Sequence, residues 1–264
     1  METKVNGLAV YTWGKPAAPP LLMIHGFPYS SSMWRNQVEA LGRSHHCVAY
    51  DIRGLGKSEV GDGQYTMESL ADDLFAVMDA LRLDQPVACG LSMGGYTVLR
   101  AAEREPERFR GLILCDTRSE ADTDAARIRR AELIKAINAG DMESFAAGMA
   151  AATFTPDAAN RIPDIYQAAL QEIESQPPLG VKGCLLAMAS RTDTTAFLAR
   201  IRVPVLLIVG EKDGLTPVVE MQAMQQRIAG SRLEVVPNAG HMAPLENPGA
   251  VTQAIEDFLG SITS

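Results

Sequence analysis

Short apolar runs that alternate with helical patterns are the feature that most restricts the fold of this sequence. Six such runs lie at residues 21–24, 47–50, 87–89, 112–115, 203–209 and 233–236. Continuous apolar runs of this length are typical of strands buried on both faces of a parallel sheet. Between them, apolar residues recur at helical spacing, as in residues 70–81 after Thr66, the expected N-cap. This alternation predicts a doubly wound α/β sheet.

Turn residues add detail near both ends of the chain. Asn6-Gly7 separates two short apolar stretches and predicts a hairpin within the first dozen residues. Thr216-Pro217 and Asn247-Pro248 each place a capping residue before a proline. Because proline suits the first helical position, a helix is expected to begin at each of these prolines.

The alternation stops between residues 118 and 195. This segment contains no credible strand and is rich in Ala, Met and Arg. It therefore predicts a helical cap, inserted into a core made of residues 1–117 and 196–264. Because open α/β sheets place their sites at the carboxyl ends of the strands, we expect the cap to cover that edge.

Charge and composition narrow the range of partners. The chain has 264 residues and a net charge of −8, and its basic residues form no run. This argues against a nucleic acid or an anionic membrane surface as the main partner. The N-terminus lacks a signal-peptide core, and no stretch reaches the ~20 apolar residues that span a bilayer. The four cysteines have no metal-ligand spacing, so we expect a reduced, cytoplasmic protein.

The strongest local motif is GLSMGG at residues 90–95, between an apolar run and a helical stretch. It matches the G-x-S-x-G nucleophile elbow, in which a strand turns sharply into a helix with the serine at the apex. Gly90 and Gly94 are expected to approach each other closely, and the serine to adopt a strained conformation. The turn leaves the N–H of Met93 at a helix N-terminus, where an oxyanion would form. Ser92 is thus the predicted nucleophile.

A serine hydroxyl needs an imidazole to accept its proton. Of the four histidines, His241 alone lies on a small-residue loop after the last apolar run, so it is the predicted base. The acid that orients this imidazole is expected between serine and histidine in chain order. Asp213, which follows the run at 203–209, is the preferred acid, and Asp116, which follows the run at 112–115, is the alternative.

Other motifs argue against cofactors and metals. The GKS tripeptide at residues 56–58 is no Walker A loop, because Asp51 stands where that loop requires glycine. We expect Asp51 and Arg53 to be structural partners in this turn. Neither a G-x-G-x-x-G nor an H-E-x-x-H motif is present, so no dinucleotide cofactor and no catalytic zinc are predicted.

Together these residues resemble the α/β-hydrolase superfamily over nearly the whole chain. The resemblance rests on motifs in the family's order: His25-Gly26-Phe27-Pro28, Asp51-x-Arg53-Gly54-x-Gly56-x-Ser58, Gly90-x-Ser92-Met93-Gly94-Gly95, Gly210-x-x-Asp213 and Gly240-His241. It implies an eight-stranded, mostly parallel sheet with helices on both faces and a cap inserted after the sixth strand. It also implies that the N–H of Phe27 is the second oxyanion donor, whereas the side chain of His25 is expected to be structural.

Within the superfamily the chain looks most like bacterial carboxylesterases and 3-oxoadipate enol-lactonases. Ser92 argues against epoxide hydrolases and haloalkane dehalogenases, which use Asp as the nucleophile. The resemblance implies a cofactor-free hydrolase that cleaves small carboxylic esters through an acyl-enzyme. An enol-lactone hydrolase is the first alternative. A perhydrolase, an acyltransferase or a non-hydrolytic ligand-binding receptor would use the same scaffold.

The inserted segment also holds candidates for the substrate pocket. Its large apolar residues are Met142, Met149, Phe154 and Met188, each of which can line a pocket or simply pack the helices together. Its arginines are Arg118, Arg127, Arg129, Arg130, Arg161 and Arg191. An enol-lactonase needs at least one cation facing the site, because its substrate carries a carboxylate.

Overall fold

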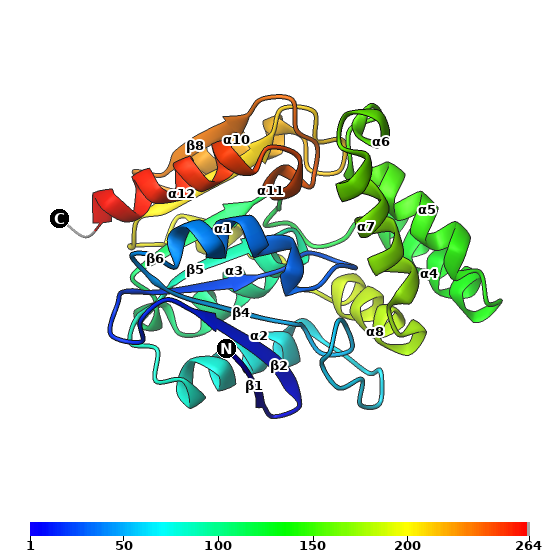
Figure 1. Cartoon of the computed structure of the whole chain (residues 1–264), viewed down its shortest axis with the longest axis horizontal. Coiled ribbons are helices and arrows are strands. Elements are labelled where there is room, and N and C mark those ends of the chain that lie inside the picture. Colours follow the sequence, from blue (N-terminus) through cyan, green and yellow to red (C-terminus); the bar gives the residue numbers. More distant parts are fainter. Residues whose placement is uncertain (263–264) are drawn as a thin grey trace.

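The apolar runs form one sheet of eight strands in the order β1-β2-β4-β3-β5-β6-β7-β8 (Figure 1). The computed structural model describes residues 1–262. The strands are β1 (Glu2–Val5), β2 (Leu8–Trp13), β3 (Pro20–Ile24), β4 (His46–Tyr50), β5 (Val87–Leu91), β6 (Gly111–Cys115), β7 (Val205–Gly210) and β8 (Arg232–Val236). The pairs β1–β2 and β2–β4 are antiparallel, and the other neighbours are parallel. The expected eight-stranded, mostly parallel sheet is confirmed.

The hairpin and the buried strands agree with the sequence patterns, and two strands differ in detail. Asn6 and Gly7 have φ angles of 47° and 83° and form the turn between β1 and β2. Strand β7 begins at Val205, two residues later than the apolar run at 203–209. Strand β8 is largely exposed, since it pairs only with β7 and forms the edge of the sheet. The prediction that this run is buried on both faces was wrong.

Helices cover both faces of the sheet. The core helices are η1 (Ser31–Trp34), α1 (Arg35–Leu41), α2 (Met67–Ala80), α3 (Met93–Arg104), η2 (Pro106–Arg108), α10 (Val218–Arg227), α11 (Ala243–Glu246) and α12 (Pro248–Ile262). Helices α1 and α12 pack against each other, as do α2 and α3, and Figure 1 shows these two pairs on opposite sides of the sheet. Thr66 caps α2 through a reciprocal capping box with Ser69, as its position predicts.

Between β6 and β7 the chain forms only helices. They are α4 (Asp124–Asn138), α5 (Met142–Thr153), α6 (Ala158–Arg161), α7 (Pro163–Ser175), α8 (Pro178–Ala189) and α9 (Thr195–Leu198). We call α4 to α8 the inserted helices. Figure 1 shows them together, in green, beyond one end of the sheet. Helix α4 packs on α5 and α8, and α5 packs on α7.

Hydrogen bonds tie the inserted helices to the core. The hydroxyls of Ser30 and Ser32 donate to the carboxylate of Glu172 on α7. The N–H of Gly56 donates to the side-chain oxygen of Gln176 over 2.8 Å. Because these contacts hold the loops after β3 and β4, the inserted helices are fixed over the carboxyl ends of the strands.

The turn at residues 51–58 is structural, but its pairing differs from the expected one. Asp51 accepts hydrogen bonds from the N–H groups of Ser31 and Lys57, each over 2.9 Å. Arg53 instead forms an ion pair with Asp73 of α2, 2.6 Å away. The predicted Asp51–Arg53 pair is therefore wrong, because Asp51 already has donors and Arg53 turns toward α2. Within residues 1–262, no helix has the length and apolar character needed to cross a membrane.

Candidate active site

Ser92 occupies the turn between β5 and α3. It has φ 52° and ψ −112°, the strained conformation expected of an elbow residue. Its N–H donates to the carbonyl of Cys115 over 2.9 Å, and its carbonyl accepts the hydroxyl of Thr117 over 2.8 Å. These bonds hold the apex of the turn against the end of β6. They therefore fix the backbone position from which the side chain of Ser92 extends.

Glycines are required on both sides of the elbow. A Cβ on Gly90 would lie 2.4 Å from the carbonyl oxygen of Gly94, and a Cβ on Gly94 would lie 2.3 Å from that of Ile24. Both distances are shorter than any real carbon contact, and both neighbours are backbone atoms. The expected close approach of the two glycines is therefore present, and it brings the N-terminus of α3 against the end of β3.

The predicted base and acid are hydrogen-bonded to each other. Nδ1 of His241 lies 2.8 Å from Oδ2 of Asp213, and both side chains are almost completely buried. His241 lies on the loop after β8, and Asp213 lies on the loop after β7. Because Nδ1 donates to the carboxylate, Nε2 of the neutral imidazole is free to accept a proton.

Asp213 is held by the loop that follows it. Its Oδ1 accepts the N–H groups of Leu215 and Thr216 over 2.8 and 3.0 Å, and the hydroxyl of Thr216 donates to Oδ2. Burial opposes the ionisation of Asp213, but the charge of His241 and the hydrogen bonds from His241 and Thr216 outweigh it. Together they lower the pKa of Asp213 to about 2.

Thr216 contributes to the site rather than to a helix cap. Its hydroxyl lies 3.3 Å from Nδ1 of His241, in addition to its bond to Asp213. Helix α10 begins at Val218, one residue later than Thr216-Pro217 predicts, because this side chain is turned toward the carboxylate. Asn247 does cap α12, through a bond from the N–H of Ala250.

Two backbone N–H groups lie near the elbow without an acceptor. Met93 is the first residue of α3, directly after Ser92. Phe27 follows β3, and a Cβ on the preceding Gly26 would lie 3.5 Å from Cβ of Ser92. Among residues 1–262, neither the N–H of Phe27 nor that of Met93 has a hydrogen-bond acceptor. Their positions suit a pair of oxyanion donors.

His25 has a structural position. Its ring is fully buried, Nδ1 contacts the carbonyl of Gly26 over 2.9 Å, and Nε2 accepts the N–H of Ile52 over 2.8 Å. Burial lowers the pKa of His25, so the ring is neutral and uses both nitrogens within the fold. The structural interpretation of this residue agrees with these contacts.

A cavity of about 460 Å³ contains Ser92 and His241 in its wall. Its large apolar lining residues include Phe27, Leu133, Phe145, Met149, Leu185 and Met188. Two of the candidate pocket residues, Met149 and Met188, are therefore lining residues. Phe154 instead packs edge-on against Tyr166, with ring centroids 5.4 Å apart. The cavity is mainly apolar and lies between the elbow and the inserted helices.

Four arginines also line this cavity: Arg118, Arg129, Arg130 and Arg191. Arg130 and Arg191 share the carboxylate of Asp122, and Arg118 pairs with Glu220. The guanidinium of Arg129 has no hydrogen-bond or ion-pair partner within residues 1–262. The single carboxylate of Asp122 therefore balances two guanidinium groups, and the guanidinium of Arg129 is unpaired. The wall of the cavity thus carries excess positive charge.

Glu246 is a buried residue that the sequence patterns did not reveal. Its carboxylate accepts the N–H of Gly240 over 2.8 Å, next to His241, and the N–H and hydroxyl of Thr155. Arg161 of α6 pairs with it over 2.7 Å. Glu246 thus joins the histidine loop to the inserted helices. No local motif signals this role, because Thr155 is 91 residues away in the sequence.

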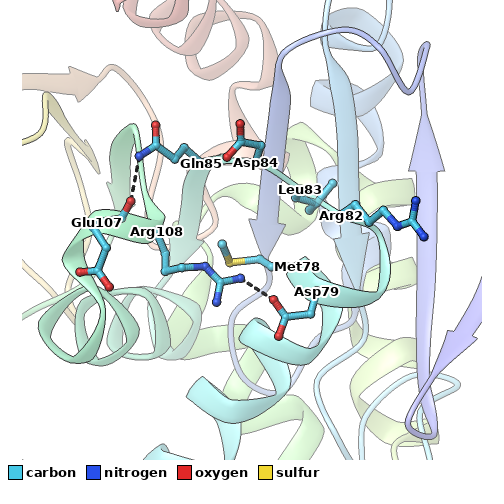
Figure 2. Close-up of a pocket in the computed structure, with 8 residues that line it drawn as sticks. All are labelled: Met78, Asp79, Arg82, Leu83, Asp84, Gln85, Glu107 and Arg108. Atoms are coloured by element: carbon cyan, nitrogen blue, oxygen red, sulfur yellow. Dashed lines mark hydrogen bonds and ion pairs between the residues drawn. The ribbon is translucent and has the colours of Figure 1, made fainter.

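A second hollow lies at the other end of the strands. It has a volume of about 430 Å³ and lies beside the end of α2 and the turns before β5 and β6. Figure 2 shows that Asp79 and Arg108 pair across it, and that Gln85 donates to the carbonyl of Glu107 over 2.9 Å. Its lining contains no serine, cysteine or histidine. It therefore lacks a serine or cysteine nucleophile and a histidine base, and is not a second candidate active site.

Comparisons with known proteins agree with this geometry. A family model described as "alpha/beta hydrolase fold" matches residues 19–248. The chain is 31% identical to 3-oxoadipate enol-lactonase 2 of Acinetobacter baylyi, covering 93% of this chain and 90% of that protein. A thermophilic esterase from Thermogutta terrifontis, solved with malate bound, is 34% identical, with a TM-score of 0.95 and full coverage of both chains. An enol-lactonase from Burkholderia xenovorans is 28% identical, with a TM-score of 0.90, covering 98% of this chain and 100% of that one.

Proposed function

Because this chain belongs to the α/β-hydrolase family, we propose that it is a serine hydrolase of small carboxylic esters. The observation that carries the proposal is the buried His241–Asp213 pair, whose imidazole shares one cavity with the strained Ser92. A serine at an elbow, an imidazole with a free Nε2 and a carboxylate behind it are the parts that acyl transfer requires.

In the first half of the reaction, Nε2 of His241 takes the proton of Ser92 while Oγ attacks the ester carbonyl. Asp213 holds the imidazole in the productive tautomer and stabilises the imidazolium. The N–H groups of Phe27 and Met93 donate to the oxyanion of the tetrahedral intermediate. His241 then returns the proton to the leaving alcohol, which leaves an acyl group on Ser92.

In the second half, His241 removes a proton from a water molecule that attacks the acyl-enzyme. The same two N–H groups stabilise the second oxyanion, and the acid leaves as Ser92 recovers its proton. No cofactor enters these steps. We assign residues 1–117 and 196–264 to the hydrolase core and residues 118–195 to a cap that roofs the cavity. The four unpaired, buried cysteines suit the reducing cytoplasm, where we place the protein.

Substitution of Ser92 tests the proposal. We expect Ser92→Ala to lower kcat for p-nitrophenyl butyrate by more than about 10⁴-fold with an unchanged fold, and a fluorophosphonate probe to label Ser92 alone. Ser231→Ala, at a distant loop, is the matched control. A pre-steady-state burst would support the acyl-enzyme, whereas a ligand-binding receptor would show no turnover. Retained hydrolysis in Ser92→Ala would refute the assignment.

The excess positive charge of the cavity supports a second candidate, the hydrolysis of an enol-lactone that carries a carboxylate. Arg129 has a free guanidinium in the lining, and a charge-assisted bond to a carboxylate would use it. The similarity to two enol-lactonases, and to an esterase solved with malate, is consistent with an anionic substrate.

Comparison of an anionic enol-lactone with a neutral ester separates the two candidates. If the lactone is the substrate, we expect Arg129→Ala to lower its kcat/KM by about 10- to 100-fold and to leave the neutral ester little changed. Arg127→Ala is the control, because Arg127 lies on the same helix but pairs with Asp124. A preference for the neutral ester in the unmodified enzyme would favour the carboxylesterase.

A further inference from the structure

A second carboxyl group lies beside the histidine–aspartate pair. Asp116 directly follows β6, and Asp213 follows β7, the neighbouring parallel strand, so both project from the same edge of the sheet. The side chain of Asp116 is completely buried. One polar atom each of Asp116, Asp213 and His241 lie within 4.8 Å of one another. Two acids therefore face one imidazole.

The two oxygens of Asp116 have different surroundings. Oδ1 accepts the N–H of Gly210 over 2.8 Å, and the N–H of Asp116 itself donates to the carbonyl of Ile208 over 2.8 Å. These bonds to β7 fix the side chain. Oδ2 is buried and has no hydrogen-bond partner within residues 1–262. A charged oxygen without a donor is costly to bury, and a second negative charge beside Asp213 adds repulsion.

Both costs disappear if Oδ2 carries a proton. The groups that face it are Asp213 and His241 from the loops after β7 and β8, and the Cys115 thiol, which has Cys89 as its neighbour. Burial raises the pKa of the Cys115 thiol, so this group is neutral. Burial, and then the charge of Asp213, raise the pKa of Asp116 well above its usual range. Of these groups, Asp213 is the one that carries a negative charge and can accept this proton.

We infer that Asp116 is a positioning residue that donates a hydrogen bond from its neutral carboxyl to Asp213, and that it supplies the negative charge of the site when Asp213 is neutralised. The inference rests on the triad of the proposed function. In the unmodified enzyme the proton of Asp116 stays in place while the proton of Ser92 moves to His241. In Asp213→Asn, Asp116 releases its proton to solvent and accepts the N–H of the introduced amide. The amide oxygen then stays toward Nδ1–H of His241 and keeps the productive tautomer, while the N–H groups of Leu215 and Thr216 lose the acceptor that Oδ1 of Asp213 gives them.

A double-mutant cycle tests this coupling. We expect Asp213→Asn to lower kcat/KM by about 10²- to 10³-fold, less than the ~10⁴-fold typical of a triad with one acid. Asp116→Asn alone costs about threefold, because its amide N–H replaces the donor to Asp213. Adding Asp116→Asn to Asp213→Asn costs at least a further ~10-fold. Asp73→Asn, which removes another buried carboxylate, is the matched control and should not interact with Asp213→Asn.

The pH profile provides a readout that a purely structural role would not change. In Asp213→Asn, kcat/KM shows a rise with pH that the unmodified enzyme lacks, as Asp116 ionises, and this additional rise disappears in the double variant. Asp116→Ala should be less active than Asp116→Asn, because only the amide restores the donor. Thermal unfolding shows whether each variant is folded. If the double variant is not folded, the pH profile of kcat/KM for Asp213→Asn tests the inference by itself. The inference would be overturned if the losses of the two single variants simply multiplied in the double variant, or if the pH profile of Asp213→Asn matched that of the unmodified enzyme. Full activity in Ser92→Ala would instead overturn the proposed function.

Discussion

At the scale of single residues, the charge of Asp213 is fixed by its donors. Thr216, Leu215 and His241 all donate to its carboxylate, which lowers its pKa to about 2. Above pH 4, therefore, Asp213 does not titrate. A loss of activity on acidification above pH 4 thus does not come from neutralisation of Asp213.

We expect log kcat/KM to fall with a slope no steeper than one between pH 7 and pH 4, because the proposed mechanism has one base and Asp213 keeps its charge over this range. Initial rates with a neutral p-nitrophenyl ester between pH 4 and pH 9 give this slope, with circular dichroism at each pH as the control for folding. A slope of two would mean that a second group, such as Asp213, titrates in the same range.

The glycines of the elbow allow a prediction about stability. Gly94→Ala should lower the free energy of unfolding by about 3 kcal/mol or more, because its Cβ would overlap the backbone of Ile24. Gly249→Ala is the control. Its Cβ would meet nothing within 4 Å, and alanine favours α12 by up to ~1 kcal/mol. Denaturant unfolding measures both, and an equal effect of the two substitutions would contradict the steric argument.

Single residues differ in how well the sequence predicts them. Ser92 and its glycines lie in one short motif with its own steric logic, so pattern and structure agree. Asp213 and His241 were predicted from chain order and from their loops, and the structure brings them together. Glu246 was missed because its partners Thr155 and Arg161 are remote in the sequence, whereas Thr216 was missed because its place before Pro217 was interpreted as a helix cap.

At the scale of secondary-structure elements, the histidine loop depends on the inserted helices. Glu246 of α11 accepts the N–H of Gly240 and groups from Thr155 and Arg161. Removal of this carboxylate would leave several buried donors without an acceptor. The position of His241 is therefore tied to a segment that contributes no group to the proposed triad.

We expect Glu246→Ala to lower the free energy of unfolding by about 3 kcal/mol or more, the cost of breaking a buried ion pair. It should also lower kcat, because the loop that carries His241 loses its support. Glu246→Gln keeps one acceptor oxygen and should recover part of both losses. Glu256→Ala, an exposed position on α12, is the control. Unchanged kcat in a destabilised Glu246→Ala variant would show that Glu246 acts on stability alone.

Elements were predicted best where burial determines their pattern. The strands from β3 to β7 are apolar because both faces are covered, and the ends of their runs are correct to within two residues. The exposure of β8 was missed, because an apolar run does not show whether its strand lies at the edge of a sheet. Helix α10 begins later than predicted, because Thr216 bonds to Asp213.

At the scale of the whole molecule, the size of the cavity limits the substrate. Its volume of about 460 Å³ suits small molecules. We expect kcat/KM for acetyl and butyryl esters to exceed that for palmitoyl esters by at least about tenfold, since a long chain cannot bury its methylenes there. A p-nitrophenyl ester series measures this preference, with detergent controls for solubility. Efficient hydrolysis of long-chain triglycerides would contradict this limit on substrate size.

The place of the inserted helices between β6 and β7 has a consequence for how such a protein can diversify. The proposed nucleophile, acid and base follow β5, β7 and β8, whereas much of the substrate wall comes from the segment between β6 and β7. Chemistry and specificity are thus encoded in separate stretches of the gene. The segment between β6 and β7 can change during evolution while the core that carries the proposed triad is kept. The changed segment must still supply the hydrogen-bond donors of Glu246.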